Sequence, residues 1–140
     1  GQTFLVGSSS GGVSQWVLRP GEAAACSGSW STNQGELTAI RCRAGRVVTC
    51  GHRPHIRTWE LFTDPAGDGY WQVVREVSLD GPVTSLQMDG SDGVVSTTAG
   101  SIYRVGGGKT PAVRIGGGHG AKVTGLTFSE RGDLTASCDI

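Results

Sequence analysis

A run of serines between two glycines is the first stretch whose residue types can do chemistry. Residues 7–11 (Gly-Ser-Ser-Ser-Gly) match the Gly-x-Ser-x-Gly pattern of a serine nucleophile. That arrangement needs a strand before the serine and a helix after it, so that the hydroxyl lies near helix amides. Residues 13–18 have the composition of a strand instead. The sequence therefore predicts a hairpin turn at 7–11.

Residues 106–110 end in Gly-Lys-Thr, as a phosphate-binding loop does. Such a loop also needs an earlier glycine, where this chain has Tyr103, and a following helix whose N-terminal amides bind the phosphate. Pro111 and the apolar residues after it indicate a strand. We interpret 106–110 as a flexible loop between strands.

Histidine, serine and aspartate occur together near the end of the chain, as His119, Ser137 and Asp139. A nucleophilic serine needs a base within reach, and a serine one residue away from an aspartate suits hydrogen bonding at a strand end better. Asp64 and Asp68 lie in a glycine-rich loop that lacks the ligand spacing of a calcium loop. The sequence predicts no catalytic, metal or cofactor site.

The segment 41–57 concentrates basic side chains and contains no acidic one. Arg41 and Arg43 are two apart on a predicted strand, so they point to one face. Since the planar guanidinium group suits carboxylates, we expect a partner-binding patch for an acidic surface. The alternative is that these side chains are solvated or paired with Glu36 or Glu60. The patch consists of Arg41, Arg43, Arg46, Arg53, His55 and Arg57.

The composition is that of a small neutral chain. Of 140 residues, 24 are glycine and 17% are charged, and twelve basic side chains balance twelve acidic ones. Such a chain has no overall field that attracts nucleic acid or an anionic membrane. No apolar run approaches the ~20 residues of a membrane span. The first residues lack the pattern of a signal peptide. We expect a cytoplasmic protein, unless these are not the natural ends, with Cys26, Cys42, Cys50 and Cys138 reduced.

Short clusters of β-branched and aromatic residues alternate with glycine, serine, aspartate and asparagine along the whole chain. This pattern predicts an all-β fold of many short strands. The expected strands are residues 3–7, 13–18, 23–29, 37–43, 46–50, 56–62, 72–79, 83–88, 93–97, 101–105, 112–115, 123–128 and 133–137.

An internal repeat organises these strands. Thr38, Thr84 and Thr124 each follow an apolar residue and precede a small and then an apolar residue, and they stand 46 and 40 residues apart. A period in the low forties with four strands per period is typical of a β-propeller blade.

The last repeat resembles the opening half of a WD repeat. It contains Gly118-His119, an apolar strand that ends in Phe128-Ser129, and an Ala-Ser-x-Asp strand end at 136–139. Trp59-Glu60 stands where the family has Trp-Asp, and Trp16 lies in a weaker copy. The chain therefore resembles the WD-repeat β-propeller family over almost its whole length.

The resemblance implies a hydrogen-bonded tetrad that stiffens each blade. Its members here would be His119, Ser137, Asp139, Trp59 and Trp16. Gly35-Glu36 and Gly81-Pro82 replace the Gly-His dipeptide in the other units, and Val105 replaces the tryptophan, so the blades are divergent.

We divide the chain into an incomplete blade (1–34), two blades (35–80 and 81–119) and the start of another (120–140). Because a ring closes with about four to eight blades, we expect further blades in a longer protein.

The resemblance implies a non-catalytic scaffold for protein–protein interaction in a larger assembly. Divergent units of this kind are similar to those of cytoskeletal and ciliary proteins, so microtubule-associated partners such as tubulin or axonemal and centriolar proteins are expected. Two alternatives remain open: a propeller enzyme with a site on its axis, and a nucleic-acid binder that uses residues 41–57.

Overall fold

The computed structural model describes residues 1–90, 92–107, 111–116, 119–128 and 135–139, with the backbone alone for 127–128 and 135–139. These residues form thirteen strands and no helix, so none of them forms a helix that could cross a membrane. The strands are β1 (Gln2–Gly7), β2 (Gly12–Leu18), β3 (Ala25–Ser31), β4 (Leu37–Arg43), β5 (Arg46–Gly51), β6 (His55–Thr63), β7 (Gly69–Ser78), β8 (Val83–Asp89), β9 (Asp92–Thr97), β10 (Ile102–Val105), β11 (Val113–Gly116), β12 (Val123–Phe128) and β13 (Thr135–Asp139).

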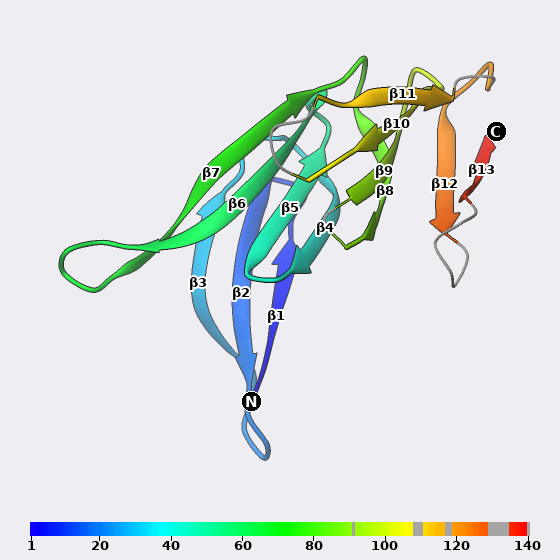
Figure 1. The fold of residues 1–140 in the computed structure, drawn as a ribbon. Helices are drawn as coiled ribbons and strands as arrows, with labels where there is room; N and C mark the ends of the chain where they lie inside the picture. The colour runs from blue at the N-terminus through cyan, green and yellow to red at the C-terminus, as the bar shows by residue number, and fades with distance from the viewer. Residues whose placement is uncertain (91, 108–110, 117–118, 129–134, 140) are drawn as a thin grey trace.

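The strands form four antiparallel sheets in chain order, with neighbours β1-β2-β3, β4-β5-β6-β7, β8-β9-β10-β11 and β12-β13. Figure 1 shows these sheets standing side by side, with the β6–β7 hairpin projecting from the second sheet. The all-β expectation is confirmed, because each expected strand has a counterpart whose ends agree within three residues.

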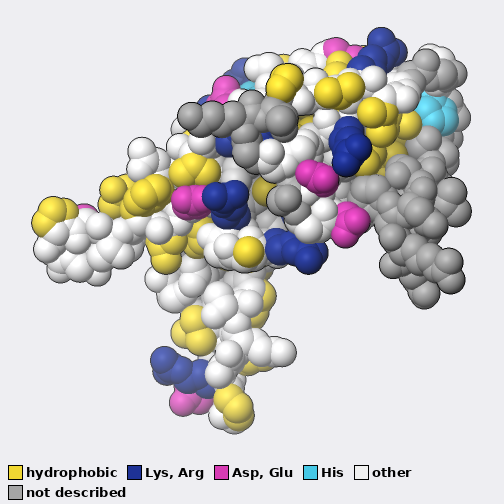
Figure 2. All heavy atoms as spheres, viewed as in Figure 1, with side chains coloured by type: hydrophobic (Ala, Val, Ile, Leu, Met, Phe, Trp, Pro, Cys, Tyr) yellow, Lys and Arg dark blue, Asp and Glu magenta, His cyan; other side chains and the backbone are white. Residues whose placement is uncertain are grey.

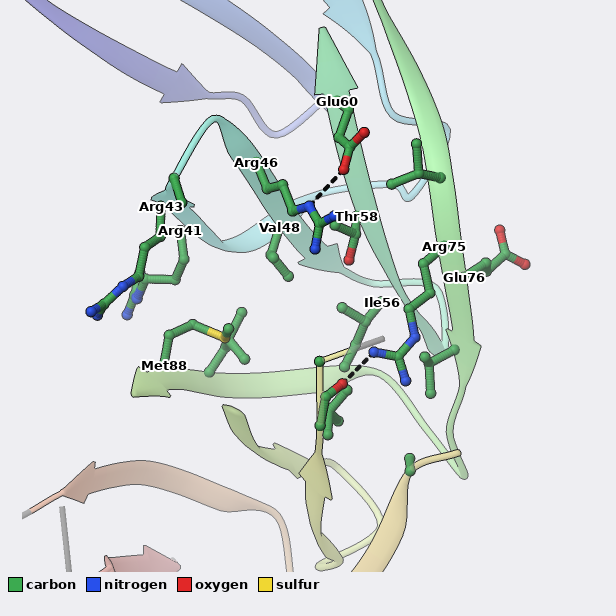
Figure 3. Close-up of a pocket in the computed structure, with 18 of the residues that line it drawn as sticks. Arg41, Arg43, Arg46, Val48, Ile56, Thr58, Glu60, Arg75, Glu76 and Met88 are labelled. Carbon is green, nitrogen blue, oxygen red and sulfur yellow. Dashed lines mark hydrogen bonds and ion pairs between the residues drawn. The ribbon is translucent and has the colours of Figure 1, made fainter. Parts of the chain in front are cut away.

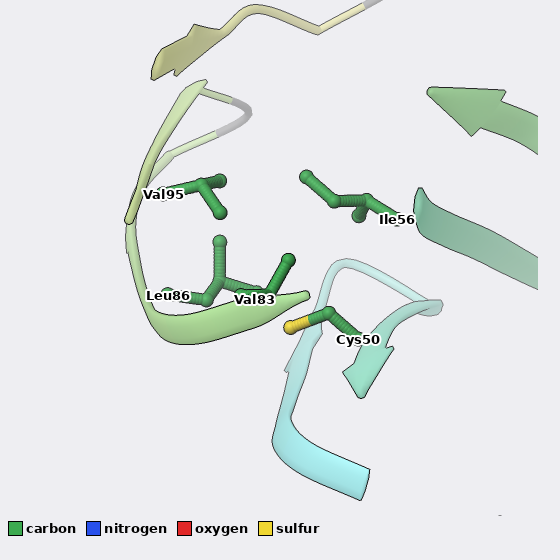
Figure 4. Packing of buried hydrophobic residues seen from close by; sticks show 5 residues of the cluster. All are labelled: Cys50, Ile56, Val83, Leu86 and Val95. Atoms are coloured by element: carbon green, nitrogen blue, oxygen red, sulfur yellow. The ribbon is translucent and has the colours of Figure 1, made fainter. Parts of the chain in front are cut away.

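The apolar contact between the second and third sheets forms the main core. Cys50 and Ile56 from the second sheet face Val83, Leu86 and Val95 from the third (Figure 4). Each of the buried valine, leucine and isoleucine side chains contributes about 1.5–3 kcal/mol relative to an exposed one. Burial also raises the pKa of the Cys50 thiol to about 12, so the thiol stays protonated at neutral pH.

The first strands of these two sheets, β4 and β8, here called the inner strands, are also joined by a hydrogen bond. The Thr38 hydroxyl on β4 donates to the Val83 carbonyl on β8 at 2.9 Å. The other faces of the two sheets are covered as well. Trp30 of the first sheet stacks on Trp71 of the second, with ring centroids 4.8 Å apart, and Leu126 of the fourth packs with Val94 of the third. The second and third sheets are therefore packed on both faces.

Two turn glycines bring neighbouring units into close contact. Gly11 and Gly100 have φ angles of 85° and 81°, which other residues rarely adopt. A Cβ on Gly11 would lie 2.8 Å from the Gly35 carbonyl oxygen, and one on Gly100 would lie 2.6 Å from that of His119. Both turns need glycine for its conformation and for its lack of a side chain.

The packing of Gly51 on β5 predicts an effect of its substitution. A Cβ there would lie 2.4 Å from the Glu36 carbonyl oxygen, and backbone cannot move aside as a flexible side chain can. We expect Gly51→Ala to cost about 1–3 kcal/mol, the usual range for overpacking. Hydrogen–deuterium exchange of β4 and β5 amides in the full-length polypeptide measures this loss.

Gly28→Ala is the matched control, since Gly28 lies on β3 and a Cβ there meets nothing within 4 Å. Equal protection of β4 and β5 in the two variants would contradict the packing argument.

Candidate functional site

A buried polar network links β5 and β6 to the residues that precede β4. The Trp59 indole nitrogen donates to the Thr49 hydroxyl at 2.8 Å, and that hydroxyl donates to the Gln34 side-chain oxygen. The Gln34 amide nitrogen donates to the carbonyl oxygens of Thr49 at 3.1 Å and His55 at 3.2 Å. Gln34 and Thr49 are fully buried, and the network gives partners to groups whose isolation would cost about 1–3 kcal/mol each.

Sequence reasoning missed Gln34 because it placed Gly35-Glu36 where the family has Gly-His. A glutamine side chain offers an acceptor and donors at once, as an imidazole does. Gln34 therefore connects Thr49 and Trp59 to the backbone. The signal in the sequence was a side chain at position 34 that can donate and accept hydrogen bonds, as the family's histidine does.

The third sheet has a different polar group at the equivalent place. Asp80 follows Gln34 by 46 residues, the same offset that separates Thr84 from Thr38. The Thr97 hydroxyl donates to Asp80 Oδ1 at 2.9 Å, and the Ser101 hydroxyl donates to Oδ2. At the same offset, Val95 and Val105 replace Thr49 and Trp59, so the polar anchor lies at the β9–β10 turn.

The electrostatics of Asp80 follow from these donors. Burial acts to raise the pKa of its carboxyl group. Hydrogen bonds from Ser101, Thr97 and Tyr103 outweigh that effect and hold the pKa below its usual value. The carboxylate is therefore the form that fits the folded turn.

The other residues that the resemblance implied for the tetrad lie in different surroundings. The Trp16 indole donates to the Ser14 hydroxyl at 2.9 Å, two residues earlier on the same strand, and so does not reach a neighbouring strand through this bond. His119 lies half-buried between β11 and β12. The side chains of Ser137 and Asp139 lie outside the described residues.

Where the structure describes the loop motifs, their residues make hydrogen bonds within their own turns. Residues 7–11 form the β1–β2 turn, in which the Ser8 amide donates to the Gly12 carbonyl at 2.9 Å, as predicted. The Asp64 carboxylate accepts the Asp68 amide at 2.8 Å within the β6–β7 turn. Residues 108–110 of the Gly-Lys-Thr segment lie outside the described residues. Cys26, Cys42 and Cys50 are free thiols, and the side chain of Cys138 is not described.

The six residues of the predicted arginine patch lie in three separate places in the structure. Arg57 points toward the first sheet, where it pairs with Glu76 at 2.7 Å and donates to the Thr32 carbonyl. Arg53 and His55 lie at the β5–β6 turn, the end of the sheet opposite to Arg46. Burial lowers the pKa of His55, and its Nε2 has no hydrogen-bond partner among the described residues. The six residues do not form one surface.

Arg41, Arg43 and Arg46 line a groove of about 1300 Å³ between the second and third sheets, here called the inter-blade groove. Figure 3 shows the side chains of Arg41 and Arg43 together at one end, Arg75 from β7 toward the other end and Arg46 between them, beside Glu60. Figure 2 shows basic, acidic and hydrophobic side chains intermingled over the middle of the face in view. The apolar lining includes Val48, Ile56, Leu86, Met88 and Val105.

The four arginines of the inter-blade groove have different partners. Arg46 pairs with Glu60 at 2.6 Å, and Arg75 donates to the Gly106 carbonyl across the groove. Arg41 donates to the neighbouring Ile40 carbonyl at 2.8 Å. Within the described ranges, neither Arg41 nor Arg43 has an ion pair. Within the described residues, these two guanidinium groups are therefore not neutralised by an ion pair.

The stacked four-stranded antiparallel sheets define the chain as part of a β-propeller. A crystal structure of the computationally designed Ika4 protein matches it with a TM-score of 0.71, covering 96% of this chain and 78% of that one. At 22% identity, this likeness shows the fold alone.

The chain belongs to the WD-repeat family. It is 32% identical over 142 residues to WD repeat-containing protein 90 of Mus musculus, 31% over 140 residues to that of Homo sapiens and 29% over 142 residues to that of Xenopus tropicalis. Each alignment covers 94% of this chain, which spans only 7–8% of the length of these relatives. No protein-family model matches the chain.

The buried network makes a prediction for Thr49→Val. This substitution keeps the shape of the side chain and leaves the Trp59 indole N–H without its acceptor. We expect the free energy of local opening of β5 and β6 to fall by about 1–3 kcal/mol. Hydrogen–deuterium exchange of these strands in the full-length polypeptide measures it. Thr63→Val, an isosteric change at an exposed position, should leave exchange unchanged; an equal effect of both would refute the network's role.

Asp80 makes a prediction for pH. Because its folded-state pKa is lowered, its contribution to stability is present above the unfolded value of about 3.9 and is lost as pH falls from there through the folded pKa. Protection of the β9–β10 turn, corrected for intrinsic exchange rates, should therefore decline in that window. Asp80→Asn should be less protected than the native chain at pH 7, and the difference should shrink at pH 3.

The control for Asp80 is Asp89→Asn, which removes an exposed carboxylate at the end of β8. A pH profile that is the same for the native chain and Asp80→Asn would show that the Asp80 carboxylate does not anchor the turn.

Proposed function

We propose that this chain is part of a non-catalytic scaffold that binds other proteins. The observation that carries the proposal is the inter-blade groove, an apolar recess with the guanidinium groups of Arg41 and Arg43 at its rim, which form no ion pair in the described part of the chain. Loops and recesses on a rigid scaffold are common places for partner binding. The groove lies between two sheets that are packed on both faces, so its walls are held in place without a partner.

The polar groups that anchor the blades support a structural role. Gln34, Thr49 and Asp80 each use their side chains in hydrogen bonds that fix a strand or a turn. Their chemistry is used to hold the blades together, and the surface that remains for recognition is the groove and the loops.

We propose further that the natural polypeptide continues this run of blades and that its partners belong to a cytoskeletal or ciliary assembly in the cytoplasm. The support is the resemblance of the divergent repeats and the match of Arg41 and Arg43 to an acidic protein surface such as that of tubulin.

Cross-linking mass spectrometry of the full-length protein in cells tests these proposals. We expect cross-links from residues 1–140 to other proteins, with tubulin or proteins bound to it among them. Cross-links confined to non-cytoskeletal proteins would refute the cytoskeletal assignment and keep the scaffold. A chain without intermolecular cross-links, together with turnover in a hydrolase screen that a single substitution abolishes, would overturn the scaffold itself.

A further inference from the structure

We propose that the inter-blade groove binds an extended acidic segment of a partner protein, whose carboxylates contact Arg41 and Arg43 and whose apolar side chains cover the groove floor beside Met88. The inference rests on the scaffold function proposed above, and it names the site and the chemistry of its ligand.

The size of the groove suits a peptide. Pockets for small ligands usually have volumes of about 300–1000 Å³. The inter-blade groove, at about 1300 Å³, exceeds that range and lies open along the line between two sheets. A segment of several residues fills such a space, whereas one small molecule leaves much of it empty.

Arg41 and Arg43 supply the charge that recognises the ligand. They stand on one face of β4, and Figure 3 shows their side chains extending side by side at one end of the groove. Two like charges held together repel each other until an anion lies between them. Arg41 commits one donor to the Ile40 carbonyl, so most of the five N–H groups of each guanidinium can reach a ligand.

The other two arginines have a different role. Arg46 is neutralised by Glu60, and Arg75 joins β7 to the Gly106 carbonyl beyond β10. These contacts hold the walls of the groove in position. The binding charge is therefore localised at Arg41 and Arg43, which a test can remove without breaking an ion pair within the described residues.

The apolar floor favours a protein segment over a nucleic acid. Val48 and Met88, which are only partly buried, line the space between the charged ends. The phosphates of a nucleic acid would contact the arginines, but its bases bind proteins chiefly by stacking on aromatic rings, which Val48 and Met88 do not offer. A peptide with leucine or phenylalanine among its acidic residues satisfies both features.

The projecting hairpin extends the apolar wall. β5 pairs with β6 as far as Glu60, so the tip of the β6–β7 hairpin lies beyond the sheet. Phe62 follows Glu60 by two residues and so lies on the same face of β6. It stacks on Tyr70, with ring centroids 6.0 Å apart, although the two side chains are 38% and 47% exposed. A bound segment that leaves the groove past Glu60 meets these rings.

Fluorescence anisotropy with a labelled peptide tests the proposal on the full-length protein. The probe is Gly-Glu-Glu-Leu-Glu-Glu-Phe-Glu-Gly, acetylated and amidated at its ends. One comparison peptide has glutamine in place of each glutamate, and another has serine in place of leucine and phenylalanine. We expect the probe to bind and both comparison peptides to bind at least about tenfold more weakly, since charge-assisted contacts and apolar burial each contribute.

The variants separate the groove from the general charge of the protein. Arg41→Ala with Arg43→Ala should raise the dissociation constant at least about tenfold. Met88→Gln should raise it severalfold, because it makes the apolar floor of the groove polar. Arg19→Ala with Arg104→Ala removes the same charge from exposed positions that do not line the groove, and should change little. Unchanged exchange protection of β4 and β8 confirms that each variant is folded.

Several results would overturn the inference. They are no binding of the probe, equal binding of the glutamine peptide, equal loss in the two arginine double variants, and tighter binding of a single-stranded oligonucleotide that depends on Arg41 and Arg43. Displacement of the probe by a second copy of the protein would assign the groove to self-association instead. If the probe fails while cross-links from residues 1–140 to other proteins persist, the groove is wrong and the scaffold function stands.

Discussion

The face-to-face packing of the second and third sheets is the constraint on which the other features depend. At the inner strands the sheets meet closely: Thr38 on β4 hydrogen-bonds to Val83 on β8, and Cys50 and Ile56 bury against Leu86. The inter-blade groove lies beside this contact, where Arg43 and Met88 line it from β4 and β8 and Arg75 and Val105 line it from β7 and β10. The packing that forms the core therefore also fixes the two walls of the recess.

In both four-stranded sheets, a polar side chain that precedes the first strand is hydrogen-bonded to the neighbouring strands, but the residue types differ. In the second sheet, Gln34, Thr49 and Trp59 form a buried hydrogen-bond network. In the third, at the same offset of 46 residues, Asp80 anchors the β9–β10 turn, and valines fill the two places further along the strands. The fold requires a hydrogen bond between the segment before the first strand of each sheet and the strands beside it. Because an amide and a carboxylate both meet this need, the identity of the anchoring residue differs between blades.

These particulars explain how far the sequence could predict the structure. Alternation of apolar residues and the spacing of turns are local properties, so the strands and the all-β class followed from them, and the repeat of Thr38, Thr84 and Thr124 indicated the blades. Gln34 was missed because its role depends on Thr49, which it meets only after folding. The sequence grouped Arg41 with Arg57, but the two face different sheets, since strand alternation and the β4–β5 turn separate them. Arg75, which lies 34 residues after Arg41, joins the groove through tertiary packing alone.

The contrast between Arg57 and the pair at the groove shows why position matters more than composition for recognition. Arg57 has Glu76 and the Thr32 carbonyl as partners, so a ligand would have to displace contacts that already stabilise the fold. Arg41 and Arg43 have no acidic neighbour to give up in the described part of the chain, and the chain as a whole is neutral, so a ligand is attracted to this place and not to the surface in general. A charge left without a partner beside an apolar recess selects ligands that carry both a carboxylate and an apolar side chain, and such selectivity is what a scaffold requires of a docking site.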